Sequence, residues 1–493
     1  MPSSAADSQC PEKAFNATAL KWHTCAWLLL PVLAFMAGWM HWYVSLPLAA
    51  LVIAGLKGKK HGTISPSPPG KEMPEAAPFP LFTGPSLLVL SAFIILMILS
   101  GWGEWVNQHP DHIVRNACLR ELVSSPWPVV FPDGDVLVYN TGFWLIPALA
   151  GKLAGLETAR AVLVLWGAWG LFLTWLWLCL FSGCRSFLLA LLMVLFGSLL
   201  NLQYWLGLDM FRLHYFGTAE QIMCSANASI PVMLFFVFLA TGRMPLHWIP
   251  LLFAGIAFYS PLAAVGGLPL ACCQWFRQWK GVQASGRIPC LFSLAGAAAL
   301  GACFFLYYAA VNAPDSQMGV RAFYTCRGDF LLAGTSFLIY ALFCWQDFRK
   351  NPLFLCTLAT GLALPFLFIN GDVNDLLCKG SVPVMACLLA FLACTWARHP
   401  GRRIWIGLAL AAGLAPRFNI PYYCCAFDAP PEAEPAVQAF SSNWFQREWR
   451  DLSQAPKSRV QNEWGSTMHH PGHRWYPYYS GTPQPWLYFI YRF

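Results

Sequence analysis

The chain has 493 residues, of which 57% are hydrophobic and 11% are charged, and its formal net charge is +8. A soluble domain carries about 25% charged residues, so this composition excludes an ordinary soluble domain and indicates a membrane protein. The positive charge does not indicate a nucleic-acid partner, because no nucleic-acid-binding motif accompanies it.

Apolar runs separated by short polar clusters follow one another along the whole chain. They lie at 26–40, 43–56, 81–103, 160–183, 186–206, 229–241, 247–259, 260–276, 288–311, 329–346, 352–369, 382–397 and 404–416. This pattern predicts an all-α polytopic membrane protein with about 11–13 transmembrane helices. Several runs are shorter than the ~20 residues that usually cross a bilayer, which is typical of tilted or broken helices.

Composition and charge divide the chain into three parts. Residues 1–80 are predicted to form a helical hairpin and a Pro-rich inner linker, 81–416 a transmembrane bundle, and 417–493 a small outer cap rich in aromatic residues. With the amino terminus inside, inner loops hold 16 Lys and Arg, and outer loops before the tail hold 8. The positive-inside rule then predicts a multi-pass protein of the plasma (inner) membrane with a cytoplasmic amino terminus and an outside carboxy terminus.

The first large outer loop, 104–159, contains three predicted elements. Pro110–Val123 has the spacing of a short amphipathic helix. The stretch 129–139 reads VVFPDGDVLVY, in which Pro-Asp-Gly between β-branched runs predicts a hairpin. Residues 142–156 are apolar around most of a helix, which favours a helix lying along the membrane surface.

The first candidate site lies at the start of this loop, in the stretch NQHPDHIVRN at 107–116. Asp111 lies between His109 and His112, and a carboxylate there could act as a general base for an acceptor hydroxyl. The alternative is structural, because Pro110 followed by Asp111 also favours the start of a helix. Residue chemistry leaves both interpretations open.

A second group of residues could bind a phosphate. Arg212 and His214 fall in the predicted outer loop at 208–223, where Glu220 could supply a second carboxylate. Arg321 and Arg327, in the outer loop at 312–328, are further phosphate-binding candidates. Arginine suits phosphate because its planar fork gives bidentate, permanently charged contacts. Charged residues that are simply solvated are the alternative.

The third candidate is the stretch INGDVNDLLCKGSVP at 369–383, in which Asp372, Asn374, Asp375 and Lys379 are crowded into one outer loop. Asp and Asn oxygens at this spacing could ligate a divalent cation, although the stretch departs from the calcium-loop pattern. Asp375 as a helix cap is the alternative. The sequence requires no cofactor and assigns no metal ligand.

The order of these elements resembles the GT-C glycosyltransferases, which are membrane enzymes that use lipid-linked sugars. The shared layout covers roughly 81–493: a span, a long outer loop that begins with an acidic residue, surface helices, a many-span bundle and an outer carboxy-terminal domain. In that superfamily an aspartate or glutamate of the first outer loop is the catalytic base. Asp111 is the matching position, followed here by His112, and Glu104 is the alternative. The stretch NDLLCKGSVP also resembles a recurring NDxxx[RK]xS[IV]P stretch of bacterial membrane proteins of unassigned function.

The resemblance implies a transferase that moves a sugar from a polyprenyl-phosphate donor to an acceptor hydroxyl, with inversion. Its partners would be membrane lipid, the lipid-linked sugar donor and a glycan or lipid acceptor. The rival function is a transporter or flippase for a polar or lipid-linked substrate. Transporters usually carry some ionisable residues near the bilayer centre. Here the predicted spans are nearly free of Asp, Glu, Lys and Arg, and charged residues cluster at the outer mouth of the bundle, which favours the enzyme.

Overall fold

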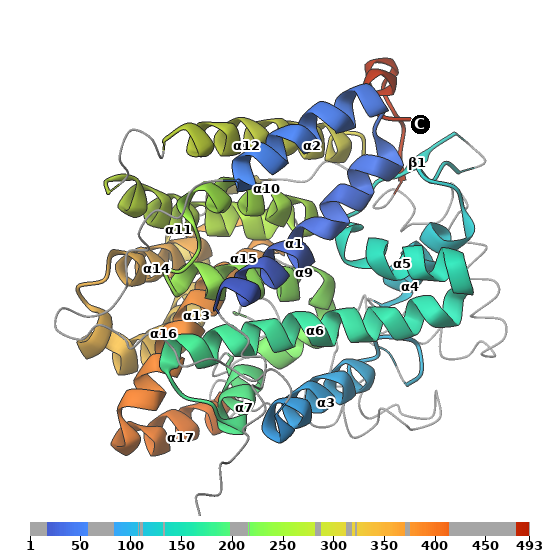
Figure 1. Ribbon diagram of the computed structural model, residues 1–493. Helices are drawn as coiled ribbons and strands as arrows, with labels where there is room; N and C mark the ends of the chain where they lie inside the picture. Colours follow the sequence, from blue (N-terminus) through green and yellow to red (C-terminus); the bar gives the residue numbers. More distant parts are fainter. Residues whose placement is uncertain are drawn as a thin grey trace, which may run out of the picture.

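The computed structural model describes residues 17–57, 83–106, 108, 112–131, 134–197, 215, 217–281, 287–311, 318–320, 323–369, 375–413 and 480–492. Helices make up most of this part of the chain (Figure 1). The α-helices are α1 Ala17–Trp39, α2 Trp42–Leu56, α3 Gly84–Leu99, α4 His112–Ser124, α5 Gly142–Ala154, α6 Leu156–Ser182, α7 Phe187–Leu195, α9 Thr218–Ala240, α10 Ile249–Tyr259, α11 Pro261–Trp279, α12 Arg287–Tyr308, α13 Phe323–Phe348, α14 Pro352–Ala363, α15 Asp375–Gly380, α16 Val382–Arg398 and α17 Arg403–Gly413.

Five helical segments of the described chain are long and apolar enough to cross a membrane by length and composition. They are Ala17–Trp39, Leu156–Ser182, Thr218–Ala240, Arg287–Tyr308 and Leu376–Arg398. The strands are only two or three residues long: β1 Val136–Leu137 pairs antiparallel with β4 Ser480–Gly481, and β2 Met318–Val320 with β3 Leu367–Ile369. The predicted all-α, membrane-type fold is therefore confirmed.

Local sequence explains where several helices begin. Thr83, Ser260 and Asn351 each cap a helix by accepting a hydrogen bond from a backbone N–H one turn in, at 3.4, 3.3 and 3.0 Å. A proline follows each cap within two residues, where its fixed φ suits the first helical turn. Ser260 also separates α10 from α11, because its backbone is extended (φ −159°, ψ 96°).

One predicted boundary was wrong. The apolar run predicts a span from residue 229, with 208–223 in a loop, whereas α9 already begins at Thr218. The polar residues of this first part, including Glu220 and Gln221, are buried and hydrogen-bonded inside the bundle. Hydropathy cannot reveal a helix whose polar side chains are satisfied by neighbouring elements.

The bundle has two distinct ends. The end that carries α4, α5, β1 and the α1–α2 turn is called here the loop end, on the right of Figure 1. Three hydrogen bonds join its parts: Tyr307 Oη accepts from the backbone N–H of Tyr139 at 3.2 Å, Asn140 Nδ2 donates to the Tyr259 carbonyl at 2.9 Å, and His41 Nε2 donates to the Tyr488 carbonyl at 3.0 Å.

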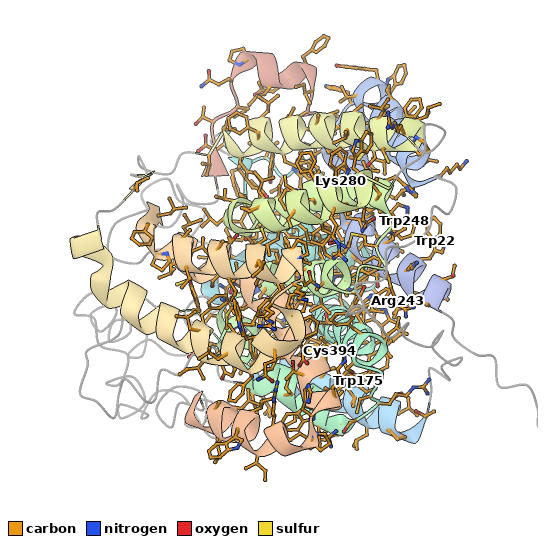
Figure 2. The ribbon with its side chains drawn as sticks, turned by 90° about the vertical axis from the view of Figure 1, so that its left-hand side faces the viewer. Trp22, Trp175, Arg243, Trp248, Lys280 and Cys394 are labelled. Carbon is orange, nitrogen blue, oxygen red and sulfur yellow. The ribbon has the colours of Figure 1, made fainter. Side chains whose placement is uncertain are left out.

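The opposite end is called here the basic end, because it carries the Lys and Arg residues that precede or follow the helices there. Trp22 of α1 contacts Trp248 edge-to-face at 4.7 Å, and Trp248 Nε1 donates to the Leu56 carbonyl at 3.2 Å. Figure 2 looks onto this end and labels Trp22, Arg243, Trp248 and Lys280, which come from different parts of the chain.

Close helix contacts hold the bundle together. A Cβ added to Gly266 of α11 would lie 2.0 Å from the carbonyl oxygen of Gly380, so only glycine allows α11 to approach α15 this closely. Small residues at helix contacts are typical of membrane bundles, where close packing replaces the hydrophobic driving force.

Candidate functional site at the loop end

The first loop begins with a strained turn directly after α3. Gly101, Gly103 and Glu104 all have positive φ angles of 88°, 96° and 64°. Glycine adopts this conformation freely, whereas Glu104 does so at a cost of roughly 1–2 kcal/mol. The turn sends the side chains of Trp102 and Glu104 into the protein, where both are buried.

Glu104 joins three elements through one carboxylate oxygen. Its side chain is 6% exposed, and its Oε2 accepts from Arg160 Nη2 at 2.7 Å and also from Arg120 Nη2. Arg120 lies on α4 and Arg160 at the start of α6, where Arg160 also pairs with the exposed Glu157. The carboxylate therefore fixes the turn against both helices.

The other oxygen of the same carboxylate is differently placed. Glu104 Oε1 is buried and has no hydrogen-bond partner among the residues that the structure describes. A buried acceptor without a donor costs about 1–3 kcal/mol, so such atoms are rare unless a ligand or water occupies the position. Glu104 thus has one oxygen held by two guanidinium groups and one buried oxygen without a donor among the described residues.

His112, the first residue of α4, is a buried anchor. It is 1% exposed, its Nε2 donates to the Met223 carbonyl at 2.9 Å, and its ring meets Trp102 edge-to-face at 4.7 Å. Arg115, one turn further along α4, is also buried and lies with its guanidinium 5.8 Å from the Trp102 ring centre. The sequence places His112 in an outer loop beside the candidate base Asp111, and the structure shows its side chain buried inside the protein.

The side chains of Trp102 and His112 contact α9 next to a break in that helix. Ser225 has non-helical angles (φ −156°, ψ 42°), which interrupts the backbone hydrogen-bond ladder. Three successive carbonyls before the break accept side-chain donors: Gln221 from Ser229 Oγ at 3.3 Å, Ile222 from Trp102 Nε1 at 2.7 Å, and Met223 from His112 Nε2 at 2.9 Å. The first loop therefore satisfies two of these carbonyls, and Ser229 of α9 itself satisfies the third.

Glu220 and Gln221 lie at the start of α9. Glu220 is the third helical residue, and its Oε2 accepts from the Gly217 backbone N–H at 2.7 Å, as in a capping box. Gln221 Nε2 donates to the Cys378 carbonyl at 2.9 Å and so connects α9 to α15. Glu220 thus lies on a buried helix start and not in a solvated loop.

A small cavity lies beside this region, between α9 and α16. Thr218, Gln221 and Ser229 form its polar side, and apolar residues such as Met233 and Leu389 form the rest. Its volume of about 20 Å³ is room for one or two water molecules and too small for a sugar.

Comparison with known protein families, curated proteins and solved structures finds no match to this chain. Function is therefore inferred from the side chains themselves.

Several residues predicted from the sequence cannot be placed. Asp111, Arg212, His214, Arg321, Asp372 and Asn374 lie outside the described residues. Arg327 belongs to α13 and Asp375 begins α15, but their side chains are not among the described ones. Lys379 lies in the last turn of α15 and is half-buried. Their substrate-binding and cation-binding roles stay predictions.

Within the described part of the chain, no three His, Cys, Asp or Glu side chains are grouped to hold a metal ion.

Sequence reasoning missed the arginines that hold Glu104. Arg120 and Arg160 are 16 and 56 residues from it along the chain. The two glycines of Gly101–Glu104 are the local signal that a turn with positive φ follows α3. The sequence does not contain a signal for which cations that turn will meet.

Proposed function

We propose that the protein is a multi-pass membrane glycosyltransferase that moves a sugar from a polyprenyl-phosphate donor to an acceptor hydroxyl at the loop end. One observation carries the proposal: Glu104, in the first loop, is a buried carboxylate with one oxygen fixed by two arginines and the other oxygen without a donor among the described residues. A general base needs this combination of fixed geometry and a free acceptor. It also matches the layout of the GT-C glycosyltransferases, which carry their base in this loop.

The proposed reaction uses a carboxylate of the first loop as base. The carboxylate takes the proton of the acceptor hydroxyl, the acceptor oxygen attacks the anomeric carbon, and the bond from that carbon to the phosphate oxygen breaks. Polyprenyl phosphate leaves with the electron pair, and the anomeric configuration inverts. Glu104 and Asp111, which directly precedes His112 in the chain, are the two candidates for the base.

Basic side chains near the leaving phosphate would stabilise its charge. Arg212, Arg321, Arg327 and Lys379 are the proposed residues. A divalent cation held by the 372–375 segment could assist in the same way, although the proposed displacement does not require one.

The proposed location is the plasma (inner) membrane, with the amino terminus in the cytoplasm and the loop end outside. The support is electrostatic. Asp347 is the one acidic residue among the described residues of the basic end, where Lys and Arg are numerous. Loops rich in Lys and Arg stay on the cytoplasmic side.

The experiment uses the purified full chain and two readouts. Polyprenyl phosphate, the product common to every such donor, should raise the thermal unfolding temperature in detergent, whereas the free polyprenol should not. Turnover of polyprenyl-phosphate hexoses and pentoses is then compared for the wild type, Glu104→Gln, Asp111→Asn and, as control, Glu157→Gln, whose carboxylate is 72% exposed.

The variant that removes the base should lose about 100- to 10,000-fold in rate while Glu157→Gln stays active. Full activity of both base variants would exclude a first-loop carboxylate as base. Equal stabilisation by the phosphate and the alcohol would argue against the donor class.

One observation favours the alternative, a transporter or flippase. The break of α9 at Ser225 makes this helix discontinuous, and discontinuous helices are frequent at transporter substrate sites. Movement of a fluorescent polyprenyl phosphate across a liposome membrane, with no release of sugar from any donor, would support this function over the transferase.

A further inference from the structure

A second polar cluster lies at the basic end, where α13 and α16 finish and α17 begins. Asp347 of α13 is its centre. Its Oδ1 lies 3.0 Å from His399 Nε2, and its Oδ2 accepts from Thr395 Oγ1 at 3.0 Å. Arg402 Nη1 lies 3.8 Å from the same Oδ2. These contacts fix the ends of three helices relative to one another.

Two arginines of this cluster bind mainly uncharged groups. Arg402 Nη1 donates to the Phe343 carbonyl at 2.9 Å. Arg403 Nε donates to the Trp396 carbonyl at 2.9 Å, and its Nη2 to the Ala397 carbonyl at 3.3 Å. A carbonyl orients a guanidinium group and leaves its full positive charge in place.

Three further basic residues surround the cluster and are exposed. Arg349 and Lys350 follow α13, and Arg398 ends α16 with its guanidinium 5.7 Å from the Phe348 ring centre. The described residues of these helix ends therefore include five positive side chains and one carboxylate, that of Asp347. A helix C-terminus favours only the cations of its own last turn. The number of positive side chains here is larger than the helix C-termini alone would favour.

Large apolar side chains border the same cluster. Trp345 is 42% exposed, Trp405 64% and Ile404 71%. Tryptophan is enriched at the level of the lipid headgroups, where its ring is partly in hydrocarbon and partly in water. If these tryptophans lie at that level, the basic side chains next to them are expected at the depth of the phospholipid phosphates.

We infer that this surface binds the phosphate of an anionic phospholipid. It is called here the α13–α17 basic surface and comprises Arg349, Lys350, Arg398, Arg402 and Arg403. Arginine forks match phosphate oxygens, and lysine adds a point charge. Arg402 and Arg403 are already oriented by the carbonyls, so less side-chain freedom is lost on binding. The inference holds whether or not the protein transfers sugars.

The test uses the full chain in an uncharged detergent. Phosphatidylglycerol, phosphatidylcholine and inorganic phosphate are titrated separately, and the thermal unfolding temperature is the readout. Phosphatidylglycerol should raise this temperature, and the other two should not. Equal stabilisation by the two lipids would overturn the inference, as would an effect of inorganic phosphate equal to that of phosphatidylglycerol.

Matched variants locate the binding site. Lys350→Gln combined with Arg398→Gln removes two exposed charges from the α13–α17 basic surface. Affinity for phosphatidylglycerol should fall about 10- to 30-fold, from roughly 1 kcal/mol for each basic residue. The control, Lys57→Gln combined with Lys280→Gln, removes two exposed charges elsewhere on the basic end and should leave affinity unchanged.

The control is spatially separate from the tested surface. In Figure 2, Lys280 lies well apart from Cys394, which is one residue before Thr395 of the cluster. An equal loss of affinity in both double variants would show unspecific attraction and would overturn the inference. Unfolding of each variant without lipid shows whether the substitutions alter the fold.

Discussion

Trp102 shows how one side chain can connect two separate features of the site. It is 1% exposed, its Nε1 donates to the Ile222 carbonyl at 2.7 Å, and its ring contacts His112. The strained turn around it is tolerated because the surrounding contacts determine its position. Its neighbour Glu104 is fixed in the same way, by two arginines.

Replacing this donor tests whether the first loop supports the break in α9. Trp102→Phe keeps an aromatic ring but leaves the Ile222 carbonyl without its indole donor. We expect a loss of about 1–3 kcal/mol in the free energy of unfolding, measured by thermal unfolding in detergent. Trp42→Phe is the control, because Trp42 is 71% exposed, and it should unfold like the wild type. Equal unfolding temperatures for all three proteins would contradict this role of Trp102.

At the scale of elements, helices are joined by contacts that leave no space for a larger residue. Gly266 of α11 faces the backbone of Gly380 in α15, and Gln221 of α9 binds the Cys378 carbonyl of the same helix. α15 thereby packs against α11 and α9 at once. It begins with Asp375 and leads directly into α16, so its position sets that of the Asp375 backbone.

Gly266→Ala tests this contact. The added methyl group would lie 2.0 Å from a backbone oxygen, so α11 and α15 must separate. The expected cost is about 1–3 kcal/mol of unfolding free energy, as for other overpacked contacts. Gly407→Ala in α17 is the matched control, because a Cβ there meets nothing within 4 Å. The prediction is wrong if the two variants unfold at the same temperature.

At the scale of the whole molecule, the two ends of the bundle have different chemistry. The loop end combines the strained turn, α4, α5 and the final residues of the chain, where Arg492 donates to the Trp39 carbonyl from its backbone N–H at 2.8 Å. The basic end combines cations with exposed tryptophans. A protein with such unlike ends is expected to take one orientation in a membrane.

Reporter fusions measure this orientation in cells. Green fluorescent protein fused before Met1 should fluoresce, because it folds in the cytoplasm. Alkaline phosphatase fused after Phe493 should be active, because its disulfides form outside the cytoplasm. The exchanged fusions serve as controls and should both be inactive. The opposite pattern would place the loop end inside and remove the proposed outer-face reaction.

Local sequence determined much of the first loop. The amphipathic spacing of 110–123 predicts a helix, and α4 occupies His112–Ser124; the apolar stretch 142–156 predicts another, and α5 occupies Gly142–Ala154. The predicted hairpin is present as the antiparallel bridge between Val130 and Val136. These features depend on periodicity and turn residues within a few positions, which a sequence displays directly.

Only the tertiary structure decided which side chains meet. The sequence could not show that Arg120 and Arg160 converge on Glu104, that Trp102 and His112 satisfy carbonyls of α9, or that α9 begins at Thr218. Pairing between distant residues depends on how the helices pack, and a polar residue satisfied inside a bundle has the same composition as one in a loop. The sequence by itself therefore determined the class of fold and the local elements, while packing over long chain separations decided the geometry of the candidate site.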